Sequence, residues 1–288
     1  MNHPLRRACP APHPIAGRGP ARSAGFSLIE LAIGLAILAL ATVGMIAAMG
    51  KQAEQRKFVQ TRSTLETARE AVLAFASANG RLPCPANAAS NGQESIASNA
   101  GGIIACTAEA GFLPAVSLGM THLDANGLLA DAWEDGAGAA AGLHYRALRY
   151  GVSSLAAPVA NALTSPALGQ PGSLTSRQNV QAAVNAGQAL HVCRSAAGIG
   201  VGANRCGVVG NVLANNAAAV IWSRGINGND PAAYSADERQ NANQVVNRVY
   251  VMRTTAPSAA LGANFDDLVT WIAYPLVAER LLRSGFVL

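Results

Sequence analysis

The chain has 288 residues, enough for one sizeable domain or two small ones, and half of its residues are hydrophobic. Its formal net charge of +5 is concentrated at the start, where Arg6, Arg7, Arg18 and Arg22 have no acidic neighbour; the rest of the chain has 17 basic and 16 acidic residues. A nearly neutral remainder with scattered charges lacks the basic footprint of a nucleic-acid-binding protein. We therefore expect no nucleic acid partner.

The first element along the chain is an apolar segment at residues 26–49. As a helix rising 1.5 Å per residue it would be about 36 Å long, which is enough to cross a bilayer. Glu30 lies near its start, and a carboxylate in lipid is costly unless it has a partner or a function. Arg22 and the small residues before Gly25 indicate a processing site ahead of the apolar segment, whereas a secretory signal peptidase cuts after it.

The motif Gly25-Phe26-Ser27-Leu28-Ile29-Glu30, after a basic leader and before a long apolar helix, resembles the signature of the type IV pilin and pseudopilin superfamily. The resemblance implies cleavage after Gly25 by prepilin peptidase, N-methylation of Phe26 by the same enzyme, and assembly with other pilin or pseudopilin subunits through the helix. It also implies a single-pass protein of the bacterial inner membrane, with its head in the periplasm, that later enters a filament at the cell surface or in the periplasm.

Two features depart from the family pattern. The leader, residues 1–25, is longer than most leaders of this family. The proline common in the middle of the family's helix is missing, since no proline lies between Pro20 and Pro83. A competing interpretation of the same segment is an ordinary signal peptide cut after Ala41, although a carboxylate within its apolar region would be atypical.

Cleavage after Gly25 would free an amine on Phe26, which could pair with Glu30 of the same or a neighbouring subunit. Removing one partner of a buried pair costs about 3 to 5 kcal/mol, because the other charge is left unpaired. We therefore expect Glu30 to act in assembly. The alternative is that Glu30 lies among the lipid headgroups.

The helix pattern continues through residues 50–80 with an amphipathic face. Apolar positions recur at intervals of seven, three, four and three residues, at Phe58, Leu65, Ala68, Val72 and Phe75. Asn79-Gly80, followed by Pro83, is a typical helix end. The sequence thus predicts one helix of about 54 residues and about 80 Å, apolar all round in its first half and amphipathic in its second.

Residues 81–288 are expected to form one α+β head, with a mostly antiparallel sheet packed on the helix, as in a pilin-like fold. Tracts rich in Ala, Gly and Asn at 136–142 and 211–219 are expected to be loops or regions of small-residue packing. The segment Phe265–Ile272 is similar to one near the end of pseudopilins. The predicted strands are 101–106, 143–152, 190–193, 217–222 and 245–252.

The cysteines support export of the head. Cys9 belongs to the leader, and its removal leaves the even set expected of an oxidised domain: Cys84, Cys106, Cys193 and Cys206. Three connectivities are open, of which we favour the local pairs Cys84 with Cys106 and Cys193 with Cys206. Four buried free thiols are the alternative. No spacing typical of a zinc site occurs.

The loop from Ser223 to Glu238 resembles the calcium-binding loop of major pseudopilins. Calcium takes six to eight oxygen ligands, and carboxylates and amides of this loop would supply several, together with an aspartate of the C-terminal segment. A solvated polar loop is the alternative. The candidate ligands are Asn229, Asp230, Asp237, Glu238, Asp266 and Asp267.

Motifs of common enzymes are missing from the sequence: there is no Gly-x-Ser-x-Gly, no Walker A and no His-Glu-x-x-His. We therefore expect a structural subunit and not an enzyme, and the large head favours a minor subunit. The alternative is a membrane-tethered periplasmic binding or enzymatic domain whose anchor only looks like a pilin helix. The sequence does not separate a type IV pilus from a type II secretion filament.

Overall fold

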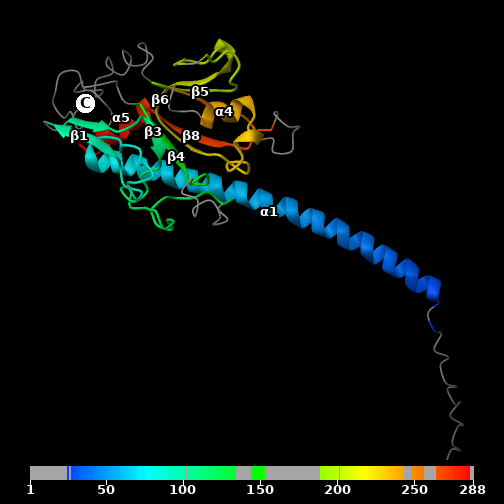
Figure 1. The fold of residues 1–288 in the computed structure, drawn as a ribbon. Coiled ribbons are helices and arrows are strands. Elements are labelled where there is room, and N and C mark those ends of the chain that lie inside the picture. Colours follow the sequence, from blue (N-terminus) through cyan, green and yellow to red (C-terminus); the bar gives the residue numbers. More distant parts are fainter. Residues whose placement is uncertain are drawn as a thin grey trace, which may run out of the picture. The chain divides into compact units, whose positions relative to one another are not determined.

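A computed structural model provides the fold of the protein (Figure 1). At 41–51, 98–100 and 103–105 only the backbone is described. The predicted loop 136–142 and the methylation site Phe26 lie outside the described residues. The structure describes residues 25, 27–100, 103–133, 144–153, 189–200, 202–242, 248–255 and 264–285.

Helix α1 runs without interruption from Leu28 to Asn79, a length of 52 residues. The prediction of one long helix is therefore confirmed. It ends where Gly80 adopts a left-handed φ of 68° and donates its N–H to the carbonyl of Ala76 at 2.8 Å, the geometry for which glycine is preferred after a helix. Among residues with described side chains, no helix is both long and apolar enough to cross a membrane; residues 41–49 of the expected span lie outside that set.

The chain divides into two compact units, Met1–Gln52 and Ala53–Leu288. In the first unit the large apolar side chains of α1 are exposed, from 55% for Ile33 to 87% for Leu28. In the second unit the helix buries one stripe. Leu65, Ala68 and Val72 lie in the main core, as the amphipathic pattern predicts.

The second unit is built on a six-stranded sheet with the order β3-β4-β6-β5-β7, and β8 pairs with β6 as well. All pairings are antiparallel except β5 with β7. Strands β1 (Ile96–Ala100) and β2 (Ile103–Cys106) form a separate antiparallel pair. The sheet strands are β3 (Ala110–Phe112), β4 (Arg149–Val152), β5 (Leu190–Cys193), β6 (Val212–Ser223), β7 (Val249–Val251) and β8 (Leu268–Ala273).

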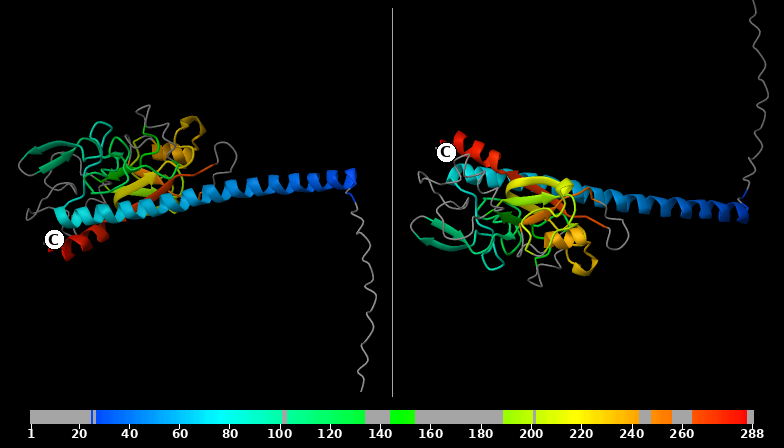
Figure 2. Two further views of the ribbon diagram at one scale, coloured as in Figure 1. Left: turned by 90° about the horizontal axis from the view of Figure 1, so that it is seen from below. Right: turned by 90° about the horizontal axis from the view of Figure 1, so that it is seen from above.

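Two short α-helices lie in the described part of this unit after α1. Helix α4 (Ala236–Ala242) contacts β7, and α5 (Tyr274–Arg283) follows β8 directly. Figure 2 shows α5 beside the C-terminal part of α1, where Arg280 donates to Glu70 at 2.8 Å. Single 3-10 turns occur at Val209–Asn211 and Pro231–Ala233. The architecture is α+β, with a long helix followed by a mostly antiparallel sheet, and is consistent with a pilin-like fold.

Of the two interpretations of 211–219, small-residue packing is confirmed and a loop is wrong, because most of this tract belongs to β6. Ala217, Ala218 and Ala219 are completely buried, and the pairing of β6 with β8 has a register irregularity between Ala217 and Ala219. Ala218 and Ala219 pack in the core that contains α1, whereas Ala217 packs in the core on the other face. Small side chains here mark close packing of layers rather than a flexible connection.

The predicted strands are otherwise partly correct. Leu190–Cys193 has the expected bounds, whereas in 143–152 and 245–252 only Arg149–Val152 and Val249–Val251 are strand among the described residues. Two disulfides join Cys84 to Cys106 and Cys193 to Cys206, the two local pairs favoured from the sequence. The first ties the segment after α1 to β2, and the second ties the end of β5 to the loop before β6.

Candidate metal centre

Three buried carboxylates meet where the start of α4 approaches the segment before β8. Glu238, Asp266 and Asp267 are at most 3% exposed, and each offers an oxygen within 4.8 Å of the other two. They come from the two segments that the sequence singled out, the polar loop ending at Glu238 and the stretch Phe265–Ile272. Within the described part of the chain they form the single group of three His, Cys, Asp or Glu side chains close enough to hold a metal ion.

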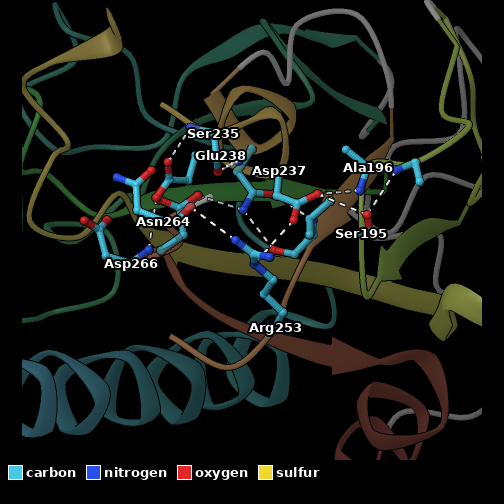
Figure 3. A network of polar contacts seen from close by, with 12 residues as sticks. Ser195, Ala196, Ser235, Asp237, Glu238, Arg253, Asn264 and Asp266 are labelled. Carbon is cyan, nitrogen blue, oxygen red and sulfur yellow. Dashed lines mark hydrogen bonds and ion pairs between the residues drawn. The ribbon is translucent and has the colours of Figure 1, made fainter. Parts of the chain in front are cut away.

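Glu238 is held in place by the start of α4. Its Oε2 accepts the N–H of Ser235 at 2.7 Å, and the N–H of Glu238 donates to Ser235 Oγ at 3.3 Å. This reciprocal arrangement is a capping box, in which residues three apart satisfy each other's backbone N–H groups at a helix start. The same carboxylate reaches across to the other segment, because Oε1 accepts the N–H of Asp266 at 3.0 Å. Figure 3 shows Glu238 between Ser235 and Asp266.

The two aspartates are anchored through one oxygen each. Asp266 Oδ2 accepts the N–H of Asn227 at 3.2 Å, and Asp267 Oδ2 accepts from Asn241 Nδ2 at 2.8 Å. Asp266 Oδ1 is buried and has no hydrogen-bond partner in the described structure. Gly225, with a φ of 62°, packs so closely that a Cβ there would lie 2.2 Å from this oxygen. The backbone of the loop thus closes one side of the site.

Ionisation of all three carboxylates is unfavourable in this buried cluster. Two effects raise the pKa of Asp266 to about 7: burial is the larger, and the neighbouring charge of Glu238 is the second. Burial also raises the pKa of Asp267 well above its usual range, with the hydrogen bond from Asn241 opposing the rise. Carboxylates in this situation hold a proton or bind a cation. The donor set of oxygens alone is of the kind that calcium prefers.

Two amide oxygens near the cluster were missed by the sequence analysis. Asn227 Oδ1 and Asn264 Oδ1 are buried and have no hydrogen-bond partner among the described residues. Asn227 Nδ2 donates to Glu238 Oε2 at 3.3 Å, and Figure 3 places Asn264 on the same side of the network as Glu238 and Asp266. Unpartnered carboxylate and amide oxygens together satisfy a basic requirement of a calcium site. The one sequence signal was the density of Asn and Asp in both segments.

The other candidate ligands from the sequence make different contacts. Asn229 Oδ1 accepts from Arg146 Nη2 at 3.3 Å. Asp230 is exposed and caps the 3-10 turn at Pro231–Ala233 through the N–H of Ala232. Asp237, next to Glu238, points elsewhere: its Oδ1 accepts the N–H of Ala196 at 2.7 Å and its Oδ2 lies 3.3 Å from Arg253 Nε, as Figure 3 shows.

The N-terminal motif is a second candidate site. Gly25 lies just ahead of α1 and has no atom within 4 Å of a Cβ position, while Phe26 lies outside the described residues. Glu30 is exposed in the first helical turn, where its N–H donates to the carbonyl of Ser27 at 3.0 Å. A carboxylate in a first turn is favoured by the helix dipole. The structure thus presents the motif as a helix start with its charge free to meet another group.

Comparison with known families identifies this motif. The fold is that of a protein with a long N-terminal helix and an α+β head. Residues 20–46 match the family described as the prokaryotic N-terminal methylation motif, the prepilin leader of type IV pilins and pseudopilins. The match supports a pilin-like or pseudopilin precursor that is processed by prepilin peptidase, anchored in the inner membrane and assembled with other subunits. Comparisons with curated proteins and with solved structures return no match.

Proposed function

We propose that this protein is a minor structural subunit, a pilin or pseudopilin, of a type IV pilus or type II secretion filament. The observation that carries the proposal is the methylation motif at 20–46, which leads directly into α1. In the proposed pathway prepilin peptidase cuts after Gly25 and methylates the amine of Phe26, and the head faces the periplasm before assembly.

The exposed apolar side chains of the first unit support a packing role for α1. Leu28, Ile29 and Leu40 are 68% to 87% exposed in the single chain. Burying apolar surface contributes about 25 cal/mol per Å², so such a helix gains free energy in lipid and again among copies of itself in a filament. We assign no catalytic step to the protein, and its role in this proposal is structural.

The experiment for this role is to shear filaments from cells and probe the sheared fraction for the protein. Deletion of prepilin peptidase should leave the full-length precursor in the inner membrane and empty the filament fraction. Recovery of the protein in the membrane alone, in cells that make filaments, would instead favour a membrane-tethered periplasmic domain.

A second role is supported by the carboxylate cluster. We assign a calcium site to Glu238, Asp266 and Asp267, with Asn227 and Asn264 as additional oxygen donors. The unpartnered, buried Asp266 Oδ1 carries this assignment. An ion there would join the start of α4 to β8 and would offset the repulsion among the three carboxylates. Its role would be to stabilise the head, because it would join two segments that are 28 residues apart in the sequence.

A further inference from the structure

A cleft of about 680 Å³ lies along β8 in the head. One wall is the amphipathic part of α1 at Arg62, Leu65 and Glu66, and the opposite wall is the segment Met252–Thr255 that follows β7. Residues Leu268–Trp271 of β8 line it between these walls. Strand β8 therefore borders the cleft.

The pairing of β6 with β4 and β8 shows which backbone N–H and C=O groups of β8 point away from β6. Ser153 donates its N–H to Ala218, so the alternate β6 residues 218, 220 and 222 face β4 and the intervening ones face β8. Thr270, opposite Ile221, therefore faces β6. Because backbone groups alternate along a strand, those of Val269 and Trp271 point away from β6.

The other edge of β8 pairs with no strand among the described residues. A contact with α1 agrees with the alternation: the carbonyl of Trp271 accepts from Arg69 Nε at 3.2 Å. Strand β7 has a second edge too, but α4 covers it. There Asn241 both donates to and accepts from the backbone of Val251, at 2.9 and 2.7 Å. On the described edge of β8, by contrast, Arg69 engages the carbonyl of Trp271 alone.

The chemistry around this edge selects an occupant. Trp271, Met252 and Leu213 are partly buried apolar side chains on one face of the cleft. Arg62 and Arg194 are exposed on its rim and are in no ion pair within the described part of the chain. The acidic groups of the lining are already engaged, since Glu66 pairs with Arg69 at 3.6 Å and Asp267 is buried. The rim is therefore complementary to acidic side chains.

We propose that this cleft binds an extended acidic segment of a partner protein, which adds a strand to the free edge of β8. In strand addition, backbone hydrogen bonds supply affinity and alternate side chains supply specificity. The N–H and C=O of Val269 and the N–H of Trp271 pair with the segment, its apolar side chains contact Trp271 and Met252, and its acidic side chains meet Arg62 and Arg194. This interaction is independent of the filament role and of the metal centre.

The test uses the full chain in detergent and a short fluorescein-labelled peptide of alternating Glu and Val. Fluorescence anisotropy should show saturable binding. A matched peptide with Lys in place of Glu should bind at least about tenfold more weakly, because it meets Arg62 and Arg194 with like charge. A Glu-Val peptide N-methylated on the amides that face β8 should also lose about tenfold or more, because it cannot donate to the strand.

Protein variants locate the binding site. Reversing both rim charges, Arg62→Glu with Arg194→Glu, should weaken the Glu-Val peptide by about tenfold. Lys57→Glu reverses one charge at an exposed position on α1 outside the cleft and should leave binding unchanged. The proposal is overturned if the peptide does not bind, if N-methylation has no effect, or if Lys57→Glu weakens binding as much as the double variant does.

Discussion

Glu238 accepts the backbone N–H of Asp266 at 3.0 Å, and by this contact the helix cap of α4 is joined to the segment that leads into β8. Two buried carboxylates are thereby held side by side, with Asp267 as a third. Such a cluster is costly to bury when fully charged. A bound cation or a proton relieves that cost.

Calcium should stabilise the head through this cluster. At a calcium concentration about 100 times the Kd, binding to the folded state contributes about 2.7 kcal/mol, which is about 5 to 10 °C in Tm for a domain of this size. Thermal unfolding of the full chain in detergent, with calcium and with chelator, measures the difference. Asp266→Asn should abolish it. Asp230→Asn, which alters an exposed cap outside the cluster, should keep it. A Tm indifferent to calcium in the wild type would refute the site.

The same cluster predicts a pH dependence in chelator. The pKa of Asp266 is about 7 in the folded chain and about 3.8 in the unfolded chain, so between these values the folded state binds more protons. Stability from this group is therefore present at low pH and is lost as the pH rises towards 7 and above. At pH 8 without calcium, Asp266→Asn should melt at a higher temperature than the wild type. A lower Tm for the variant would show that Asp266 is not a strained carboxylate.

Arg81 and Glu94 predict an opposite dependence at lower pH. Burial alone would raise the pKa of Glu94, but two hydrogen bonds from Arg81, at 2.7 and 2.8 Å, and one from the N–H of Cys84 lower it below 4.5. The stability from this pair is present above the unfolded pKa and is lost as the pH falls through the folded one.

Glu94→Gln should therefore cost about 3 kcal/mol at pH 7, because it leaves Arg81 buried without its partner. The cost should shrink as the pH falls through the lowered pKa of Glu94 in the folded chain, where the wild type loses the pair as well. Urea unfolding at several pH values measures both. Glu70→Gln breaks the exposed pair with Arg280 and should cost less than about 1 kcal/mol. Equal costs for the two variants would contradict a special role for the buried pair.

Glu30→Ala should be processed normally but should assemble poorly. The variant keeps Gly25 and Phe26, so cleavage is unaffected, while the new amine loses its carboxylate partner. A loss of about 3 kcal/mol or more would lower the filament fraction at least about tenfold. Immunoblots of sheared filaments against total processed protein measure it, with Glu54→Ala as a control on the same helix. Normal incorporation of Glu30→Ala would remove this role.

Local signals explain which parts of the structure were predictable. The end of α1 was correct because Asn79-Gly80 places a glycine where a left-handed φ is needed. Strand β6 was predicted only over 217–222, because the Ala- and Asn-rich tract before it has low strand propensity, and the full strand exists through pairing with β4 and β8 on its two sides. That pairing joins residues far apart in the sequence, and no local pattern reveals it.

The metal centre shows the same limit. A polar loop and an acidic C-terminal segment indicated the correct two segments, but not which side chains converge. Asp237 and Glu238 are adjacent on α4, and neighbouring helix residues face different directions, so only one joins the cluster. Asn227 was missed because its role follows from the fold of the loop around Gly225, where the close approach to Asp266 fixes the backbone.

The central claim is that this chain is a processed filament subunit, and its mature N-terminus tests it most directly. Mass spectrometry of the protein from sheared filaments should find a chain that begins at Phe26 and carries one methyl group on its amine, with residues 1–25 removed. An intact leader, or a mature chain that begins after Ala41, would contradict the account.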